Sequence, residues 1–167
     1  MARGAGSALS RTGTLEAALN GARLWGLELD PRYRVLAATL EPAVGASPWE
    51  LVEDRRVQLL CSPVSTILGA LRRQGPDGLE LATFDVEQLV EVSASFGGAM
   101  LEPPVFGRPE PRPGEWGPTF SLQGRSTAPD GRTHTATFAV SDDEARLEVF
   151  VRFDLAEVRD ADGQALG

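Results

Sequence analysis

Alternation of apolar and polar residues in the last third of the chain is the clearest pattern in the sequence. From 146 to 155, every odd position is apolar and most even positions carry a charge; 134–140 alternates in the same way with threonines. A period of two predicts strands with one face in the core and one in water. A short run at 120–123 precedes them, and short connections predict that the three strands form an antiparallel meander.

The first half of the chain contains further strand-length apolar runs. Those at 23–29 and 34–41 flank Asp30-Pro31, a turn signal, and are therefore expected to form a hairpin. Two shorter strands are predicted at 57–60 and 79–84.

Two other segments follow the helical period, and they are the main helices expected. The first is 63–73, where Ser62-Pro63 provides a start signal and four apolar residues share one face. Those residues are Val64, Ile67, Leu68 and Leu71. The second is 86–95, which begins with a capping box of Asp85 and Gln88. Shorter helices are expected at 15–20 and 48–53.

These elements predict a single α+β domain over residues 14–167, preceded by a flexible arm at 1–13. The sheet should hold about six or seven mostly antiparallel strands, with the two main helices on one face. Residues 97–118 are rich in proline and glycine and form the longest predicted loop. Loops of this length are uncommon in compact domains and are often functional or disordered.

Composition narrows the possible chemistry. The chain has 167 residues; all 16 of its Lys-plus-Arg positions are arginine, and it has one histidine and one cysteine. These counts exclude a P-loop lysine, a Schiff base, a Cys/His zinc site and an internal disulfide. We therefore expect no cofactor. The absence of lysine, with abundant Ala, Gly, Pro and Val, indicates a GC-rich bacterial source.

Charge and hydropathy bear on partners and location. The formal net charge is -8, which disfavours nucleic acid and anionic membranes as partners. No apolar run has the length of a membrane span, and the first residues lack the apolar stretch of a secretory signal. A cytoplasmic protein with one reduced thiol is the simplest expectation.

His134 and Cys61 are the only candidates for catalysis. A histidine can act as an acid or base near neutral pH, and a Cys–His pair can form in space without any sequence spacing. The alternative is that both are structural: His134 falls on the apolar face of a strand, and Cys61 lies between an apolar strand and a helix start. We favour the structural interpretation of both.

Two acidic clusters invite comparison with metal sites. Asp160-x-Asp162-Gly163 resembles the opening of a calcium loop, but its glycine comes too early and the twelfth position falls beyond Gly167. Both this cluster and 142–144 fit turn chemistry, so we expect no metal site.

The loop at 97–118 is the predicted place for specificity. Phe106 and Trp116 offer apolar anchors, and Arg108 and Arg112 offer directional donors, for a protein partner. The alternative is that the loop folds back on its own sheet and Trp116 caps the core.

The leading hypothesis is a non-enzymatic bacterial binding or assembly protein that acts through protein contacts or self-association. One alternative is a small, hydrolase-like enzyme that uses His134. Another is a carrier with an apolar cavity, which would show a pocket lined by Leu, Val and Phe.

Overall fold

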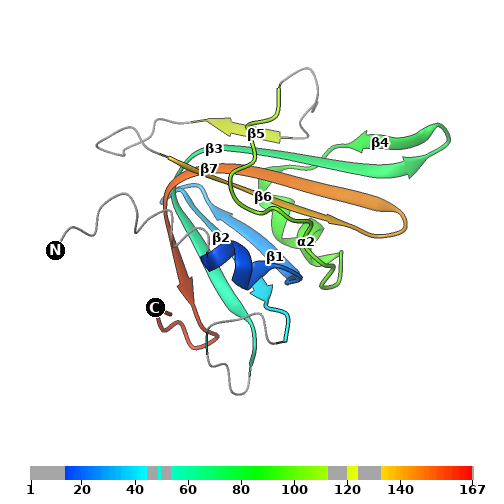
Figure 1. The fold of residues 1–167 in the computed structure, drawn as a ribbon. Helices are drawn as coiled ribbons and strands as arrows, with labels where there is room; N and C mark the ends of the chain where they lie inside the picture. Colours follow the sequence, from blue (N-terminus) through cyan, green and yellow to red (C-terminus); the bar gives the residue numbers. More distant parts are fainter. Residues whose placement is uncertain (1–13, 45–48, 50–53, 113–119, 124–132, 167) are drawn as a thin grey trace.

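The architecture is that of a computed structural model of the chain. The structure describes residues 14–44, 49, 54–112, 120–123 and 133–166. Within these ranges it is a mostly antiparallel α+β fold with short helices, as the alternating pattern predicts (Figure 1).

One sheet of seven strands makes up most of the described structure. The strands are β1 (Arg23–Asp30), β2 (Val35–Glu41), β3 (Val57–Gly75), β4 (Gly78–Ala82), β5 (Phe120–Gln123), β6 (His134–Ser141) and β7 (Ala145–Arg159). The central path runs β1-β2-β3-β7-β6, while β4 and β5 pair with β3. Every pair is antiparallel.

Strand β3 is the spine of this sheet. On one edge it pairs with β7 from Gln58 to Arg73. On its other edge it pairs in turn with β2, β5 and β4. The ladder with β2 ends at Cys61 and the ladder with β5 begins at Thr66, so this edge has a gap between them.

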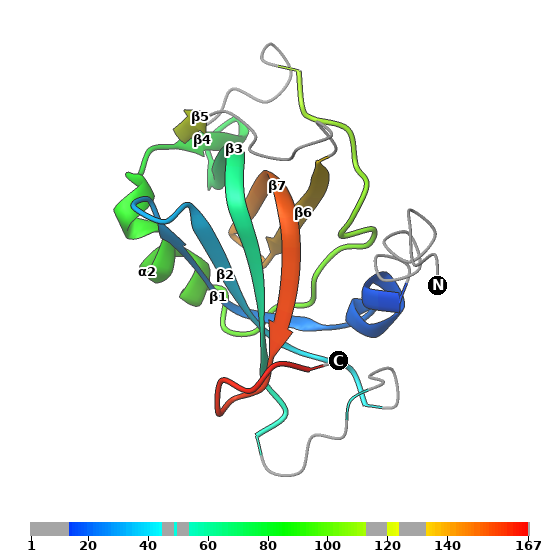
Figure 2. The ribbon, with the colours of Figure 1, turned by 90° about the vertical axis from the view of Figure 1, so that its left-hand side faces the viewer.

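The closing segment, residues 99–107, links the two ends of the central path. The Leu24 amide donates to the Ala99 carbonyl at 2.9 Å, which attaches the segment to β1. The Glu102 amide donates to the Ala139 carbonyl at 3.0 Å, which attaches it to β6. Figure 2 shows this segment running beside β6. The sheet is thereby closed on itself around one core that includes residues of β1, β6 and the segment.

The described helices are short. Residues 14–19 are helical, and a 3-10 turn η1 (Val86–Gln88) leads into α2 (Leu89–Ala94). The buried Ser93 hydroxyl of α2 accepts the Leu27 amide of β1 at 2.8 Å, so α2 covers the outer edge of β1. In the described part of the chain, no helix has the length and apolar character needed to cross a membrane.

The predicted helix at 63–73 is wrong, because this segment is part of strand β3. Its apolar spacing has a different cause: a bulge between Val64 and Thr66 shifts the alternation, and β3 is buried on both faces from 64 to 71. A strand buried on both faces has a continuous apolar run, which periodicity alone does not distinguish from a helix. The expected pair of main helices on one face is therefore also wrong.

The predicted meander is only partly correct. The hairpins β1–β2 and β6–β7 are confirmed, but β5 pairs with β3 instead of β6. The expected helix at 86–95 is confirmed as η1 and α2, and a short helix at the start of the described chain is confirmed. The arm at 1–13 and, apart from Trp49, the helix expected at 48–53 lie outside the described residues.

Candidate functional site

Of the four residues predicted to bind a partner in the loop at 97–118, the three that the structure describes do not share one surface. Phe106 is 8% exposed and belongs to the core, and an isolated bridge pairs it with Ala136 of β6. Arg112 is exposed, and Trp116 lies outside the described residues. Residues 99–107 therefore follow the alternative in which the loop folds back on its own sheet.

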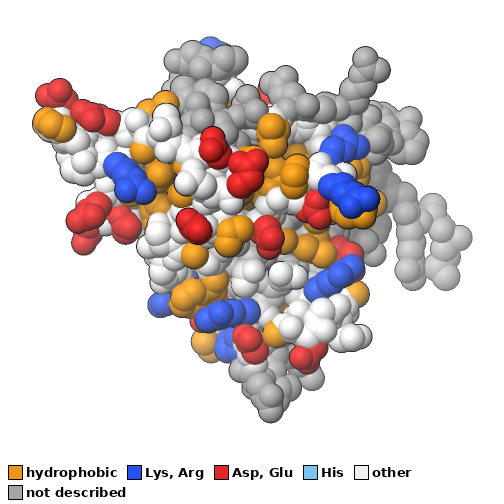
Figure 3. All heavy atoms as spheres, turned by 180° about the vertical axis from the view of Figure 1, so that it is seen from behind, with side chains coloured by type: hydrophobic (Ala, Val, Ile, Leu, Met, Phe, Trp, Pro, Cys, Tyr) orange, Lys and Arg blue, Asp and Glu red, His pale blue; other side chains and the backbone are white. Residues whose placement is uncertain are grey.

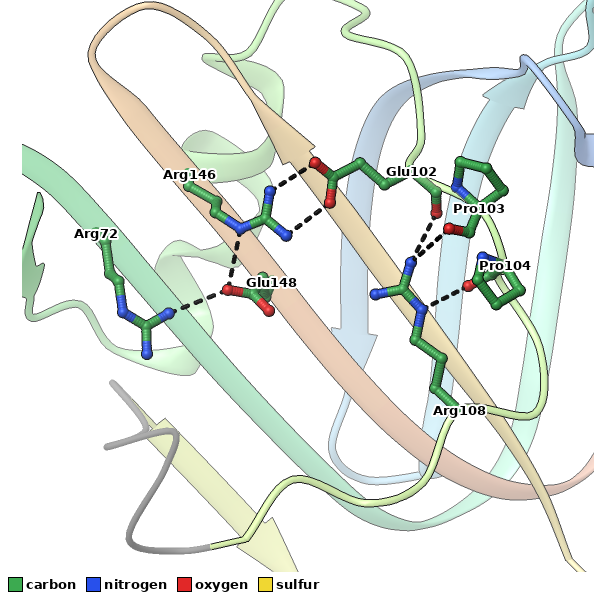
Figure 4. Close-up of polar contacts among 7 residues, drawn as sticks. All are labelled: Arg72, Glu102, Pro103, Pro104, Arg108, Arg146 and Glu148. Carbon is green, nitrogen blue, oxygen red and sulfur yellow. Dashed lines mark hydrogen bonds and ion pairs between the residues drawn. The ribbon is translucent and has the colours of Figure 1, made fainter.

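Arg108 directly follows the closing segment and bonds to its backbone. Its guanidinium donates to the carbonyls of Pro104 at 2.8 Å, Pro103 at 3.0 Å and Glu102 at 3.1 Å. Figure 4 shows the side chain curling back toward these three carbonyl oxygens. A guanidinium fork suits such a set, because it presents several donors in fixed directions. Arg108 thus holds the turn of the closing segment.

His134 and Cys61 are on strands that flank β7 from opposite sides. His134 is opposite Phe153, with ring centroids 6.0 Å apart, whereas Cys61 is opposite Ala156. Two strand spacings and three residues of rise separate their positions by roughly 14 Å. Burial also raises the pKa of the Cys61 thiol, which disfavours the reactive thiolate. The structure does not bring these residues together as a nucleophile and base.

An ionic network crosses the outer face of β3 and β7 (Figure 4). Glu148 accepts from Arg72 at 3.1 Å and from Arg146 at 3.2 Å. Arg146 also forms two hydrogen bonds of 2.6 Å with the Glu102 carboxylate. The hydrogen bond from Arg146 lowers the pKa of Glu102, and the same pair raises the pKa of Arg146. Both arginines are committed to carboxylates, so the network fastens the closing segment to the sheet.

The sequence contains the charged residues of this network, but their relation becomes clear only when the pairing of β3 with β7 is known. Arg72 and Arg146 are directly opposite each other in the β3–β7 ladder. Like charges placed opposite each other are destabilising unless something intervenes, and Glu148 does so here. The erroneous helix at 63–73 concealed the pairing, because it placed Arg72 at a helix end.

In each of the two acidic turns, an aspartate side chain accepts hydrogen bonds from backbone amides of the same turn. One Asp142 oxygen accepts the amides of Glu144 and Ala145, each at 2.8 Å. Likewise, one Asp160 oxygen accepts the amides of Asp162 and Gln164, each at 2.9 Å. No group of metal-ligating side chains occurs among the described residues. Asp142 and Asp160, the first residues of the two acidic clusters, thus accept the amides of their own turns.

A small cavity opens at the gap between β2 and β5 on the edge of β3. Its volume is about 230 Å³. It is lined by Leu29, Pro31, Arg34, Val64, Ser65, Ile67 and Leu122. The lining is mainly aliphatic, with one guanidinium and one hydroxyl. It is therefore of the general kind expected for a small apolar ligand.

A second hollow is larger and more polar. It lies between the β3–β4 hairpin, α2 and the β6–β7 turn, and Leu71, Arg73 and Ser95 are shared by its two lobes. On the face shown in Figure 3, the coloured acidic, basic and apolar side chains are interspersed, without a broad field of one sign. The described residues that line the hollow are a mixture of apolar, basic, acidic and neutral polar side chains.

Strand β4 is the most exposed apolar element of the sheet. Leu79 is 51% exposed and Leu81 is 47% exposed, and both occupy this short strand. Within the described ranges β4 pairs only with β3, so its other edge carries no strand. The hairpin that it forms with β3 extends away from the body of the sheet (Figure 1).

Comparisons with known proteins found no relative of this chain. No family model, curated protein or solved structure matches the chain.

Proposed function

We propose that the protein is a non-enzymatic binding protein of a bacterial cytoplasm and that a strand of a protein partner pairs with its β4 edge. The observation that carries this proposal is the open edge of β4 with two exposed leucines. Edge strands offer unpaired backbone groups, and proteins usually protect them with charge, proline, bulges or a covering segment. An edge left open beside exposed leucines is the opposite arrangement, and it favours pairing with another chain.

The two ends of the central path are covered, whereas β4 and β5 each pair only with β3 among the described residues. The edge of β1 is covered by α2 through Ser93. The edge of β6 is covered by the closing segment, whose Val105 carbonyl accepts the Thr137 amide at 2.7 Å. Of these two short strands, β4 carries two exposed leucines and β5 carries one, Leu122, so β4 presents the more apolar edge.

The hairpin geometry defines which backbone groups of β4 face outward. Gly75 and Gly78 flank the two-residue turn, and their pairing is the hydrogen-bonded kind in such hairpins. Hydrogen-bonded and non-hydrogen-bonded pairs alternate, so Leu79 and Leu81 direct their amides and carbonyls away from β3. The Gln74 amide, opposite Leu79, donates to the Glu144 carbonyl at 2.7 Å, in agreement with this alternation.

The side chains on this edge favour an apolar partner strand. Leu81 is opposite Arg72 and Leu79 is opposite Gln74, so both leucines lie on one face of the hairpin. A strand added to β4 would place alternate side chains on the same face, beside these leucines. The backbone would supply the hydrogen bonds, and the leucines would supply selectivity for apolar side chains.

The experiment places a photo-crosslinking amino acid at Leu79 and irradiates the protein, both purified and in its host. The expected result is a covalent adduct with a second copy or with one protein partner. Leu81→Pro should weaken this association about tenfold or more, because it removes an outward amide and leaves the ladder to β3 intact.

The matched control is Leu155, which is 71% exposed on β7. The crosslinker at this site should give no adduct, and Leu155→Asp should leave the adduct at Leu79 unchanged. Leu79→Arg is a second variant that keeps every backbone donor. An adduct equally abundant at Leu155, or one insensitive to both β4 variants, would refute the proposed edge.

A further inference from the structure

The cavity beside β3 is independent of the β4 edge. It lies at the point where β2 leaves β3 and before β5 joins it. In this gap the Val64 amide donates to the Arg34 carbonyl at 2.8 Å. The β1–β2 turn therefore reaches across and forms one wall, while the opposite edge of β3 stays paired with β7.

We propose that this cavity binds a small carboxylic acid with a compact apolar body, with the carboxylate at Arg34. Val64 and Ile67, which are 6% and 1% exposed, form its apolar wall, and Leu122 stands at its more exposed side. An apolar cavity of about 150 Å³ accommodates benzene, so by proportion about 230 Å³ accommodates roughly nine non-hydrogen atoms.

The polar groups of the cavity favour an anion. The Ser65 hydroxyl donates to the Arg152 carbonyl at 3.3 Å, so its proton is already used. Among the described residues that line the cavity, Arg34 is the one that carries a charge. One nitrogen of its guanidinium donates to the Val64 carbonyl at 3.5 Å, and a guanidinium has five N–H donors in all. Guanidinium groups bind carboxylates through charge-assisted hydrogen bonds, which are stronger than neutral ones.

The backbone at Arg34 provides an independent reason to assign it a role. Its φ is 54°, and among the described residues it is the one non-glycine with positive φ. Glycine adopts this conformation without the penalty that a side chain meets there. The turn is fixed by Asp30, whose carboxylate accepts the Arg32 amide at 2.9 Å and the Tyr33 amide at 3.2 Å. An arginine in a position suited to glycine, facing an apolar cavity, is consistent with selection for its guanidinium.

The test measures binding of phenylacetate to the full chain by amide chemical shifts. Phenylacetamide, which has the same shape without the charge, is the matched ligand. We expect saturable binding of phenylacetate with a Kd of roughly 0.1–1 mM, typical of so small a ligand, and shifts centred on the cavity residues. Phenylacetamide should bind about tenfold more weakly or worse.

Three variants separate recognition from folding. Arg34→Gly should weaken phenylacetate binding about tenfold or more while the protein stays folded, because glycine suits this φ and offsets the loss of the hydrogen bond to the Val64 carbonyl. Arg32→Gly is the matched control, since Arg32 lies in the same turn and stacks on Tyr33 instead of lining the cavity. Leu122→Trp should abolish binding of both ligands by filling the cavity.

Other results would overturn the proposal. Equal affinity for phenylacetate and phenylacetamide, or an unchanged affinity in Arg34→Gly, would remove the role of the guanidinium. Absence of saturable binding at about ten times the expected Kd would remove the site itself. None of these results depends on whether a protein partner pairs with β4.

Discussion

The Glu102 carboxylate and the Arg146 guanidinium are joined by two hydrogen bonds of 2.6 Å each. Glu102 begins the part of the closing segment that runs along β6, and Arg146 is on β7. The pair therefore connects an irregular segment to the second strand inward from the sheet edge. It reinforces, from the outer face, the backbone hydrogen bonds that close the sheet.

The first prediction concerns the acid sensitivity of this pair. The pKa of Glu102 is lowered in the folded protein, so its contribution to stability is present above the ordinary pKa of about 4.3 and is lost as pH falls further. Glu102→Gln should cost about 0.5–1 kcal/mol near neutral pH, because the pair is partly exposed and screened by solvent. Urea unfolding at neutral pH and at about pH 3 measures the difference, which should shrink in acid.

Glu157 provides a control for that prediction. Like Glu102, it forms an ion pair with an arginine, but this partner, Arg159, is on the same strand. Both side chains of this pair are more than 40% exposed. Glu157→Gln should change the free energy of unfolding very little. An equal effect of the two substitutions would show that closure of the sheet gains nothing from Glu102.

The second prediction concerns Arg108. Arg108→Met keeps the apolar stem but removes the donors to three carbonyls, and it should cost about 1–2 kcal/mol. Arg108→Lys should recover only part of the loss, because an ammonium does not reproduce the fork. Hydrogen exchange of the Glu102 and Gly107 amides, which bond to β6, should become faster. Unchanged stability and exchange would leave the side chain available for the partner role expected from the sequence.

The third prediction compares two serines of the α2 region. Ser93 is buried, and its hydroxyl accepts from the Leu27 amide, whereas the exposed Ser95 bonds only to the nearby Val92 carbonyl. Ser93→Ala should cost about 1–3 kcal/mol, because a buried amide of β1 loses its partner. Ser95→Ala should cost much less. Thermal unfolding of both variants tests this, and similar losses would contradict the claim that Ser93 anchors α2.

Strands with one buried face could be predicted well from the sequence. Strands β2 and β7 follow from alternation and turn residues, because one side of each is less buried for much of its length. Strand β6 was predicted from the alternation of threonines with apolar residues, although 136–140 are all buried. The same method failed at β3, where Leu68 and Ile67 are neighbours on opposite faces and both are buried. Periodicity reveals a strand when one face is buried and the other is exposed, and β3 is buried on both faces from 64 to 71.

The candidate sites depend on contacts between segments that are distant in sequence. The cavity combines Arg34 of a turn with Val64 of β3 and Leu122 of β5. Nothing local to any of these residues indicates the other two. The closing segment was expected as a loop because its prolines and glycines exclude regular pairing, yet isolated backbone hydrogen bonds suffice to attach it to both β1 and β6.

The last prediction concerns Cys61, the single thiol of the chain. It is fully buried between β2 and β7, opposite Leu36 and Ala156, and burial raises its pKa. The native protein should therefore react with a disulfide reagent only at the rate at which the sheet opens, and addition of urea should make labelling rapid. Cys61→Ser should be less stable than Cys61→Ala by about 1–3 kcal/mol if the hydroxyl lacks a partner in this apolar setting. Rapid labelling of the folded protein, with a Cys61→Ser variant as stable as Cys61→Ala, would show that the thiol is accessible and would restore its candidacy as a nucleophile.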